Sequence, residues 1–149
     1  MKSYIVIVFI LFCSSQAFSQ WFLPSDVETS LNRIEYAIRN GNFNSIEDLI
    51  PSGITMRLDD SLYESIPSIY AMKALDNFFA DKDSIQFYFG IPGNGRMVYY
   101  QDGKKKSEEV DVWLRRRDGF IEISAINISN YPIATVFFRM HRKEADKSN

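Results

Sequence analysis

Acidic residues in strand-like segments are the groups of this sequence that could carry catalytic chemistry. Asp111 and Glu122 lie in two successive segments of alternating polarity, and Asp76 lies in a segment with helical spacing. A carboxyl group buried in an apolar pocket acquires a raised pKa and can serve as a general acid or base. Asp111 and Glu122 are therefore the candidate catalytic residues, with tyrosines of the neighbouring strands as hydrogen-bond donors.

The same alternation also allows a structural role for both acids. Asp111 and Glu122 are each flanked by aliphatic residues, which must occupy the opposite face of their strands. On the solvent side, the two acids would pair with Arg115 or Arg96 across neighbouring strands, each pair contributing about 0.2–1 kcal/mol. We expect this second arrangement, in which neither acid is catalytic.

Histidine and cysteine chemistry has little support. The single histidine, His141, lies in a charged C-terminal stretch beside Arg142 and Lys143, and the single cysteine, Cys13, lies at the end of an N-terminal apolar run. A catalytic triad, a His–carboxylate dyad and a His-based zinc site all need a histidine held within the fold. We therefore expect no metal and no cofactor.

The aromatic residues of the strands are candidates for a ligand-binding surface. Ligand pockets are largely apolar with a few polar groups that fix orientation, but the same side chains would also fill an ordinary core between a sheet and its helices. Exposed tyrosines on the strands favour a homodimer through the sheet face, because tyrosine is enriched at interfaces. The ligand-binding candidates are Phe87, Phe89, Tyr99, Trp113 and Phe120.

Two basic triplets, residues 104–106 and 115–117, lie near predicted hairpin turns. Basic clusters can bind phosphate or nucleic acid, but nearby acidic residues, Glu108 and Glu109 among them, indicate solvated hairpins. The formal net charge is −2, so the chain as a whole does not attract nucleic acid. We expect no nucleic-acid partner.

The N-terminal segment has the pattern of a secretory signal peptide. Lys2 precedes the apolar run 4–12, and Ala17 and Ser19 are the small residues that favour cleavage after position 19. The run is shorter than the roughly 20 residues that a transmembrane helix needs. We therefore expect an exported protein, periplasmic or extracellular, with no transmembrane segment after signal cleavage.

The rest of the chain has the composition of one domain followed by a short extension. The extension begins with the sequence YPIATVFFRM, which is strongly β-prone and would be an aggregation hazard if exposed. We assign residues 1–19 to the signal peptide, 20–130 to one domain, 131–140 to an extra strand or packing segment and 141–149 to a disordered charged tail.

Hydrophobic periodicity and turn signals predict the order helix, helix, strand, strand, helix and then four strands. A capping box from Ser25 to Glu28 begins the first helix and Asn40-Gly41 ends it, while Asn44 and Glu47 repeat the capping pattern for a short second helix. The predicted helices span 25–40, 44–50 and 68–80, and the strands span 53–58, 62–66, 85–89, 96–100, 110–115 and 120–128. The third helix is expected to bury Ile69, Met72, Leu75, Phe78 and Phe79.

The apolar phase slips within the last predicted strand. The apolar positions change from Ile121 and Ile123 to Ile126 and Ile128, so the period of two is broken once. An extra residue in one strand of an antiparallel pair produces such a slip and bends the strand. We therefore expect a β-bulge around Ser124-Ala125.

This order of elements resembles the nuclear-transport-factor-two-like fold, also called cystatin-like or SnoaL-like. Three stretches carry the resemblance: the helix that ends with residues 37–42 (AIRNGN), the helix of residues 69–79, and the closing hairpin of residues 110–128. The same stretches are similar to a small uncharacterised secreted bacterial family of that fold. Two departures are Ile66-Pro67-Ser68, where that family has a Tyr-Ser pair, and the extension after Asn130.

The resemblance implies an α+β cone, in which a curved antiparallel sheet wraps over helices and encloses an apolar pocket at its wide end. Proteins of this fold include isomerases, dehydratases and epoxide hydrolases, together with non-catalytic binding modules, so the fold alone does not assign a function. We expect an exported, non-enzymatic binding or interaction module that dimerises through its sheet. The alternatives are a small enzyme that uses a buried carboxylate on an apolar substrate, and an accessory subunit of an envelope complex.

Overall fold

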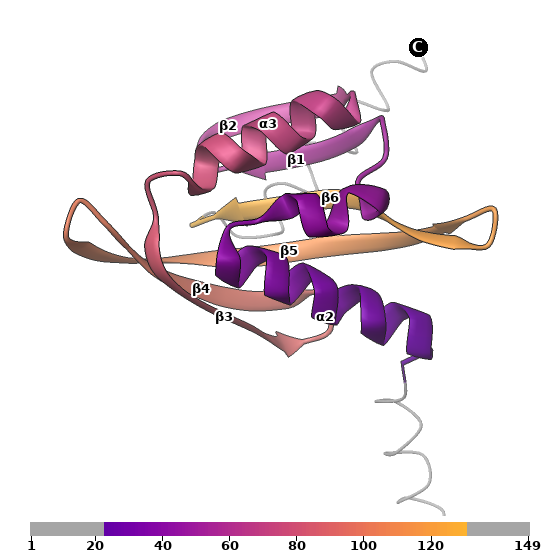
Figure 1. The fold of residues 1–149 in the computed structure, drawn as a ribbon, viewed down its shortest axis with the longest axis horizontal. Helices are drawn as coiled ribbons and strands as arrows, with labels where there is room; N and C mark the ends of the chain where they lie inside the picture. Colours follow the sequence, from indigo (N-terminus) through magenta and orange to yellow (C-terminus); the bar gives the residue numbers. More distant parts are fainter. Residues whose placement is uncertain (1–22, 131–149) are drawn as a thin grey trace, which may run out of the picture.

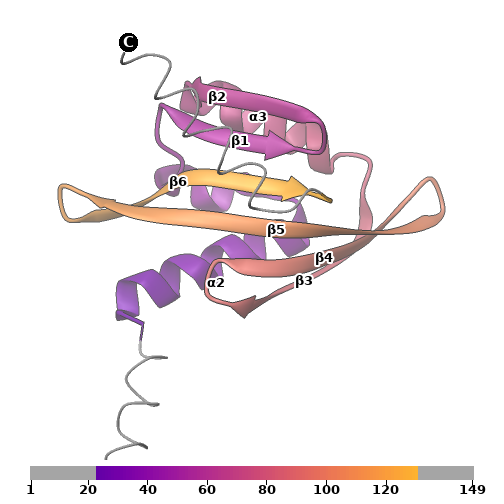
Figure 2. The same cartoon turned by 180° about the vertical axis from the view of Figure 1, so that it is seen from behind.

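The computed structural model describes residues 23–130, in which three helices pack on one face of a six-stranded sheet (Figures 1 and 2). The helices are α2 (Ser25–Asn40), η1 (Phe43–Leu49) and α3 (Ser68–Phe79). The strands are β1 (Ile54–Leu58), β2 (Ser61–Ile66), β3 (Asp83–Ile91), β4 (Asn94–Gln101), β5 (Lys104–Arg117) and β6 (Phe120–Ser129). The predicted signal peptide, the segment 131–140 and the tail with His141 lie outside the described residues.

The strands form one sheet in the order β2-β1-β6-β5-β4-β3. The chain reaches one edge through the β1–β2 hairpin, and α3 then carries it to β3 at the other edge (Figure 1). Every neighbouring pair is antiparallel except β1 and β6, which are parallel. The predicted α+β class and element order are confirmed, and the sheet is curved, unclosed and mixed rather than wholly antiparallel.

The beginnings of the first two helices differ from the predicted capping. Pro24 is the N-cap of α2 and makes no side-chain cap, and Ser25 is already helical. Proline presets a backbone angle suited to a helix start, so the boundary does not need the predicted capping box. In η1, which is a 3₁₀-helix, the cap is Asn42, whose side chain accepts a hydrogen bond from the Asn44 N–H.

Helix α3 buries Ala71, Leu75 and Phe79, which are spaced by four residues along one face. The predicted burial of Ile69 is wrong, because 73% of this residue is exposed. Ile69 precedes Ala71 by two residues, which is about 200° around an α-helix, so it points away from the core. Met72 and Phe78 are partly buried against the core.

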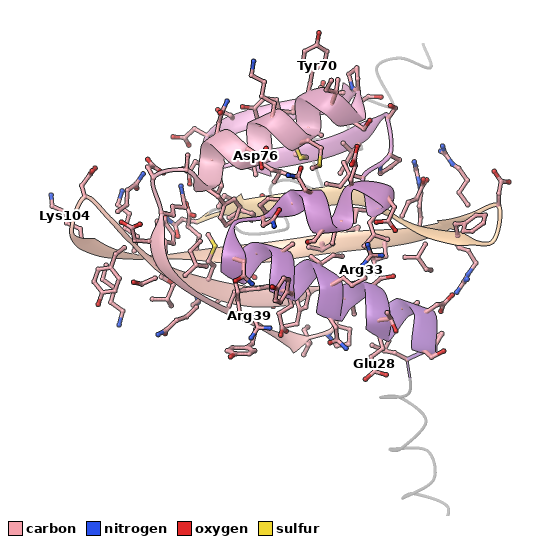
Figure 3. All side chains as sticks on the ribbon, in the orientation of Figure 1. Glu28, Arg33, Arg39, Tyr70, Asp76 and Lys104 are labelled. Carbon is pink, nitrogen blue, oxygen red and sulfur yellow. The ribbon has the colours of Figure 1, made fainter. Side chains whose placement is uncertain are left out.

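Two tight turns extend the central strands further than the sequence indicated. Asp102-Gly103 and Asp118-Gly119 each have positive φ at both residues, at 52° and 72° and at 51° and 82°. The backbone twist of such two-residue turns matches the twist of the strands that they connect. Strands β4 and β5 therefore continue almost to the hairpin tip near Lys104, which Figure 3 labels.

The predicted β-bulge is confirmed. Trp113 of β5 pairs with Ala125 of β6, while the next residue, Leu114, pairs with Ile123. Ser124 is the extra residue, and its hydroxyl donates a hydrogen bond to the Trp113 carbonyl oxygen at 3.1 Å. The bulge keeps isoleucines on the inner face on both sides of the phase slip.

Strand β3 lies at an edge of the sheet, and α2 covers part of that edge. The Phe89 N–H donates a hydrogen bond to Glu35 Oε2 at 3.1 Å. Arg39, on the next turn of α2, lies 3.5 Å from Glu35 Oε1 and 4.8 Å from the ring centroid of Tyr88 (Figure 3). A carboxylate that occupies an edge N–H removes a group to which another strand could pair.

Candidate functional site

Glu108, near the start of β5, is the acidic residue that the structure places inside the fold. It pairs with Met97 of β4 on the helix-covered inner face of the sheet, and it is only 3% exposed. The acidic and basic residues around Glu108 predict a solvated hairpin residue, and that prediction is wrong. Glu108 pairs with β4, and the residues that follow it, Glu109 to Asp111, pair with both β4 and β6, so this part of β5 lies in the interior of the sheet.

Three polar residues from different elements surround the Glu108 carboxyl group. Asp59 comes from the turn after β1, Tyr99 from β4, and Lys82 from the connection between α3 and β3. The Lys82 side chain is 3% exposed, and its Nζ donates a hydrogen bond to the Phe78 carbonyl oxygen at 2.6 Å. The same Nζ lies 3.7 Å from the ring centroid of Phe78 and 5.1 Å from that of Tyr99. The site thus lies where α3 and β1 end and β5 begins.

The surroundings of Glu108 favour its protonated form. Burial first, and then a hydrogen bond with Asp59 and the charge of that residue, raise the pKa of Glu108 to about 8. A hydrogen bond with Tyr99 and the charge of Lys82 act in the opposite direction but are weaker. Burial, followed by the charge of Glu108, also raises the pKa of Tyr99 well above its usual value. At neutral pH, Glu108 and Tyr99 therefore both carry their protons.

One oxygen of Glu108 is left without a hydrogen bond. Within residues 23–130, Oε2 is buried and has no hydrogen-bond partner. A protonated carboxyl group can both donate and accept hydrogen bonds, and it can transfer a proton. The part of the chain that the structure describes has no cluster of three or more potential metal ligands.

The predicted catalytic candidates lie away from this site. Asp111 is on the outer face of β5, 3% exposed, where it accepts hydrogen bonds from the amides of Asn94 at 2.5 Å and Asn127 at 3.1 Å. Burial raises its pKa, and these hydrogen bonds partly offset that effect. Glu122 lies in the β5–β6 hairpin, with its Oε1 2.5 Å from Arg115 Nε and 3.2 Å from Arg117 Nε. Both acids are engaged in cross-strand contacts and do not approach Glu108.

The aromatic candidates divide between three places. Phe87, Phe89 and Tyr99 lie on the inner face, and the Phe87 and Phe89 ring centroids are 4.9 Å apart. Trp113 is half-buried on the outer face opposite Ala125. Phe120 is 77% exposed at the tip of the β5–β6 hairpin and so cannot line an internal pocket.

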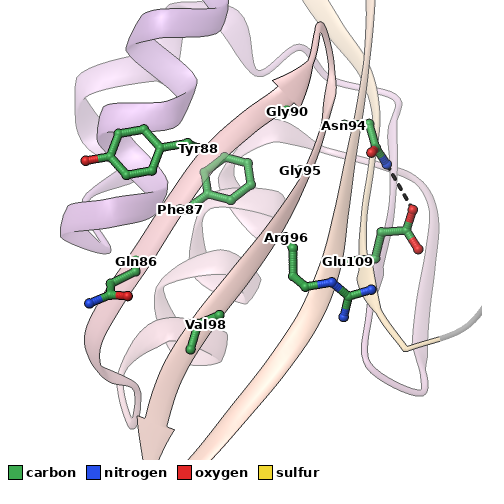
Figure 4. A pocket seen from close by; sticks show the side chains of 9 residues that line it. All are labelled: Gln86, Phe87, Tyr88, Gly90, Asn94, Gly95, Arg96, Val98 and Glu109. Carbon is green, nitrogen blue, oxygen red and sulfur yellow. Dashed lines mark hydrogen bonds between the residues drawn. The ribbon is translucent and has the colours of Figure 1, made fainter.

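An open groove of about 680 Å³ runs along β3 and β4 near their connecting turn (Figure 4). At one side of the groove, Asn94 of β4 donates a hydrogen bond to Glu109 Oε1 of β5 at 3.0 Å. Its lining combines aromatic, charged and amide groups. The lining residues are Gln86, Phe87, Tyr88, Gly90, Asn94, Gly95, Arg96, Val98 and Glu109.

The alternation of β5 contained the signal for Glu108. Val110, Val112 and Leu114 define the apolar phase of this strand. Continuing that phase back by two residues places Glu108 on the same inner face. The basic residues 104–106 beside it resembled a solvated hairpin and concealed this continuation.

Solved structures of bacterial proteins have a similar fold. A DUF4783 family protein from Bacteroides uniformis is 13% identical with a TM-score of 0.52, and the match covers 68% of this chain and 96% of that one. An NTF-2 like protein of unknown function from Shewanella oneidensis is 12% identical with a TM-score of 0.52, covering 70% and 96%. An LEH-like epoxide hydrolase from M. tuberculosis is 8% identical with a TM-score of 0.52, covering 70% and 78%.

The sequence itself matches no protein-family model and no curated protein. None of the helices within residues 23–130 is both long and apolar enough to cross a membrane. Likeness at these low identities concerns the fold and leaves the activity open. The chain therefore has the nuclear-transport-factor-two-like fold, which proteins of unknown function share with an epoxide hydrolase.

Proposed function

We propose that this protein is an exported, non-enzymatic binding module that holds a small, mainly apolar molecule at Glu108. The buried Glu108 Oε2 atom without a hydrogen-bond partner carries the proposal. Leaving a buried polar atom unpaired costs about 1–3 kcal/mol. Sequences usually retain such a cost where the group serves a function.

The surroundings of the carboxyl group define the class of ligand. Met97 and the Phe78 ring provide apolar surface, and the exposed Asp59 places the site just beneath the molecular surface. Because Glu108 is protonated at neutral pH, it suits a neutral hydroxyl or carbonyl group. A cationic group would also be repelled by the Lys82 ammonium.

A small acid–base enzyme is the second candidate, and the raised pKa of Glu108 favours it. A general acid works best when its pKa lies near the working pH, and the pKa of Glu108 is raised to about 8. The hydrogen bond with the adjacent Asp59 would hold the proton on Glu108. One solved structure of similar fold is an LEH-like epoxide hydrolase.

Substitution of Glu108 by glutamine separates the two candidates. Glutamine is neutral, has the same shape and can donate to Asp59, so the Glu108→Gln variant should keep binding, whereas Glu108→Leu should weaken it at least about tenfold through the lost hydrogen bond. Phenol serves as the probe, followed by NMR of the methionine methyl groups, because Met97 pairs with Glu108. Glu109→Gln, on the opposite face, is the matched control.

Two results would contradict the binding proposal. One is phenol binding that is equal in the Glu108→Leu variant and the unchanged chain, with no response at the Met97 methyl. The other is turnover of a small epoxide such as styrene oxide that disappears in Glu108→Gln, because glutamine cannot transfer the proton. That second result would establish the enzyme candidate instead.

We extend the proposal to a homodimer through the exposed half of the outer sheet face, on β3 and β4. Tyr88 is 64% and Tyr100 44% exposed there, with Val98 between them on β4. Tyrosine is enriched at protein interfaces. Sedimentation velocity should show dimers. The Val98→Lys variant should be monomeric, whereas Lys73→Ala, at an exposed position of α3, should remain dimeric. A monomer at every concentration would contradict this part of the proposal.

A further inference from the structure

A second open groove, of about 680 Å³, lies beyond the opposite end of β5 from Glu108. It is bounded by the first turns of α2, the end of η1 and the β5–β6 hairpin (Figure 1). Its lining includes Asp26 and Thr29 of α2, Asp48 and Leu49 of η1, and Phe120 and Ile121 of the hairpin. Ligand sites commonly have volumes of about 300–1,000 Å³, so the groove is large enough for a small molecule.

Phe120 gives the groove an exposed aromatic wall. The residue directly follows the turn at Asp118-Gly119 and is 77% exposed, so it contributes little to the core. The face of an aromatic ring carries a partial negative charge and attracts groups with a partial positive charge, such as C–H bonds next to oxygen. Leu49 and Ile121 add apolar surface to the same groove. The ring of Phe120 is therefore available to a molecule that brings an apolar face.

Two acidic residues of the lining, Asp26 and Asp48, are each paired with an arginine. Asp26 Oδ2 accepts a hydrogen bond from Arg116 Nη1 at 2.6 Å. Asp48 Oδ2 accepts one at 2.9 Å from Nη1 of Arg33, which Figure 3 labels. Chiefly through these hydrogen bonds, the arginines lower the pKa of both carboxyl groups, so both are ionised at neutral pH. The charges cancel in pairs, and the groove therefore favours neither an anion nor a cation.

The lining can both accept and donate further hydrogen bonds. The side chains of Asp26 and Asp48 are 47% and 64% exposed, and a carboxylate can accept about four hydrogen bonds. Thr29 Oγ1 donates to the Ser25 carbonyl oxygen at 2.8 Å, which leaves the lone pairs of this hydroxyl oxygen to accept. Both hydrogen bonds that Arg116 makes within the described part of the chain come from Nη1, so its Nε and Nη2 can donate to a ligand. Asp26 and Arg116 thus present acceptors and donors side by side.

We propose that this groove binds a neutral pyranose sugar, at a site separate from Glu108. One C–H face of the sugar ring lies against Phe120, and two neighbouring hydroxyl groups bind the ion pair of Asp26 and Arg116. One of these hydroxyl groups donates to the carboxylate and the other accepts from the guanidinium. A pyranose suits the groove because it combines an apolar ring face with adjacent hydroxyl groups. A wholly apolar molecule would cover the carboxylates without replacing their hydrogen bonds to water, which is unfavourable.

Titration with simple glycosides, followed by NMR of the leucine and isoleucine methyl groups, tests the proposal. The probes are methyl β-glucopyranoside, methyl β-galactopyranoside and methyl α-mannopyranoside, which present different arrangements of neighbouring hydroxyl groups. At least one of them should bind with a millimolar dissociation constant and shift the methyl signals of Leu49 and Ile121, which line the groove. Cyclohexanol, a ring of similar size with one hydroxyl group, should bind more weakly.

Substitutions in the groove separate stacking from hydrogen bonding. Phe120→Ala should weaken binding at least about tenfold, whereas Phe120→Tyr, which keeps an aromatic face, should retain it. Asp26→Asn should also weaken binding, because it removes the carboxylate that accepts from the sugar. Tyr36→Ala is the matched control, since Tyr36 is an exposed aromatic residue of α2 that does not line the groove. Phe120, Asp26 and Tyr36 are all exposed, so each variant should fold as the unchanged chain does.

Three results would overturn the proposal. The first is that none of the three glycosides shifts the Leu49 or Ile121 methyl signals. The second is equal binding by Phe120→Ala and the unchanged chain. The third is cyclohexanol binding as tight as that of the best glycoside, which would show that the groove selects apolar molecules. Phenol binding at Glu108 is followed at the Met97 methyl group, so either proposal can fail without the other.

Discussion

Replacing Glu108 with glutamine should stabilise the domain at pH 8–9 and leave its stability near pH 4 almost unchanged. The folded protein raises the pKa of Glu108 from 4.5 to about 8. Between these two values the folded state holds a proton that the unfolded state has released. The free energy of unfolding must therefore fall as the pH rises through this window.

The direction of the change in stability with pH follows from the direction in which folding shifts the pKa of Glu108. The stability associated with a raised pKa is fully present below the unfolded pKa and is lost as the pH approaches the folded pKa. The loss amounts to about 1.4 kcal/mol for each pH unit, so across the window it is on the order of a few kcal/mol. Glutamine does not titrate, and its amide can donate to Asp59 as the protonated carboxyl group does.

Urea unfolding at a series of pH values measures this effect. The difference in unfolding free energy between Glu108→Gln and the unchanged chain should grow from near zero at about pH 4 and level off above about pH 8. The control is Glu109→Gln, one residue away on the outer face, which should follow the pH profile of the unchanged chain. Parallel profiles for Glu108→Gln and the unchanged chain would show that Glu108 is not buried in its protonated form.

Local patterns in the sequence were sufficient to predict the order of the elements and the bulge in β6. The slip at Ser124-Ala125 breaks a period of two, and an antiparallel strand can accommodate it in few ways. Capping residues were less informative, because Pro24 could start α2 without the side chain of Ser25. The parallel contact of β1 with β6 depends on how distant segments meet, which local periodicity does not report.

The candidate site was predictable only in its chemistry. A buried carboxyl group beside a tyrosine was the arrangement considered for Asp111 and Glu122, and the structure has it at Glu108 and Tyr99 instead. Asp111 shows why the assignment failed, because it is buried on the outer face of the sheet. Alternation separates the two faces of a strand, but it does not show which face is covered or by what.

Gly95 illustrates the same limit in a single residue. Within the sequence Pro92-Gly93-Asn94-Gly95 it looked like part of a turn, but it lies within β4 and pairs with Phe89 of β3. One α-hydrogen of Gly95 lies close to β3, in the direction that a side chain would take. A Cβ atom at this position would meet the Tyr88 carbonyl oxygen and would lie 2.6 Å from Cε2 of Phe87.

Replacing Gly95 with alanine should therefore be strongly destabilising. The Tyr88 carbonyl oxygen belongs to the backbone of β3 and cannot move without separating β3 from β4, and the Phe87 ring is 1% exposed with little room to rotate. Overpacking of a filled core typically costs 1–3 kcal/mol, and the backbone clash places this substitution at the upper end, about 3 kcal/mol. For a domain of this size such a loss lowers the melting temperature by more than about 10 °C.

Gly90→Ala is the matched control, because Gly90 lies in β3 beside the same turn and a Cβ atom there would meet nothing within 4 Å. Alanine at Gly90 should leave stability unchanged or raise it slightly by restricting the unfolded chain. Urea unfolding of the two variants isolates the cost of the close approach from the general effect of replacing a strand glycine. If Gly95→Ala were as stable as Gly90→Ala, β3 and β4 could separate at this pair without cost. The groove along these strands would then be adaptable, and the packing of Phe87 beneath it would not fix the shape of the inner face.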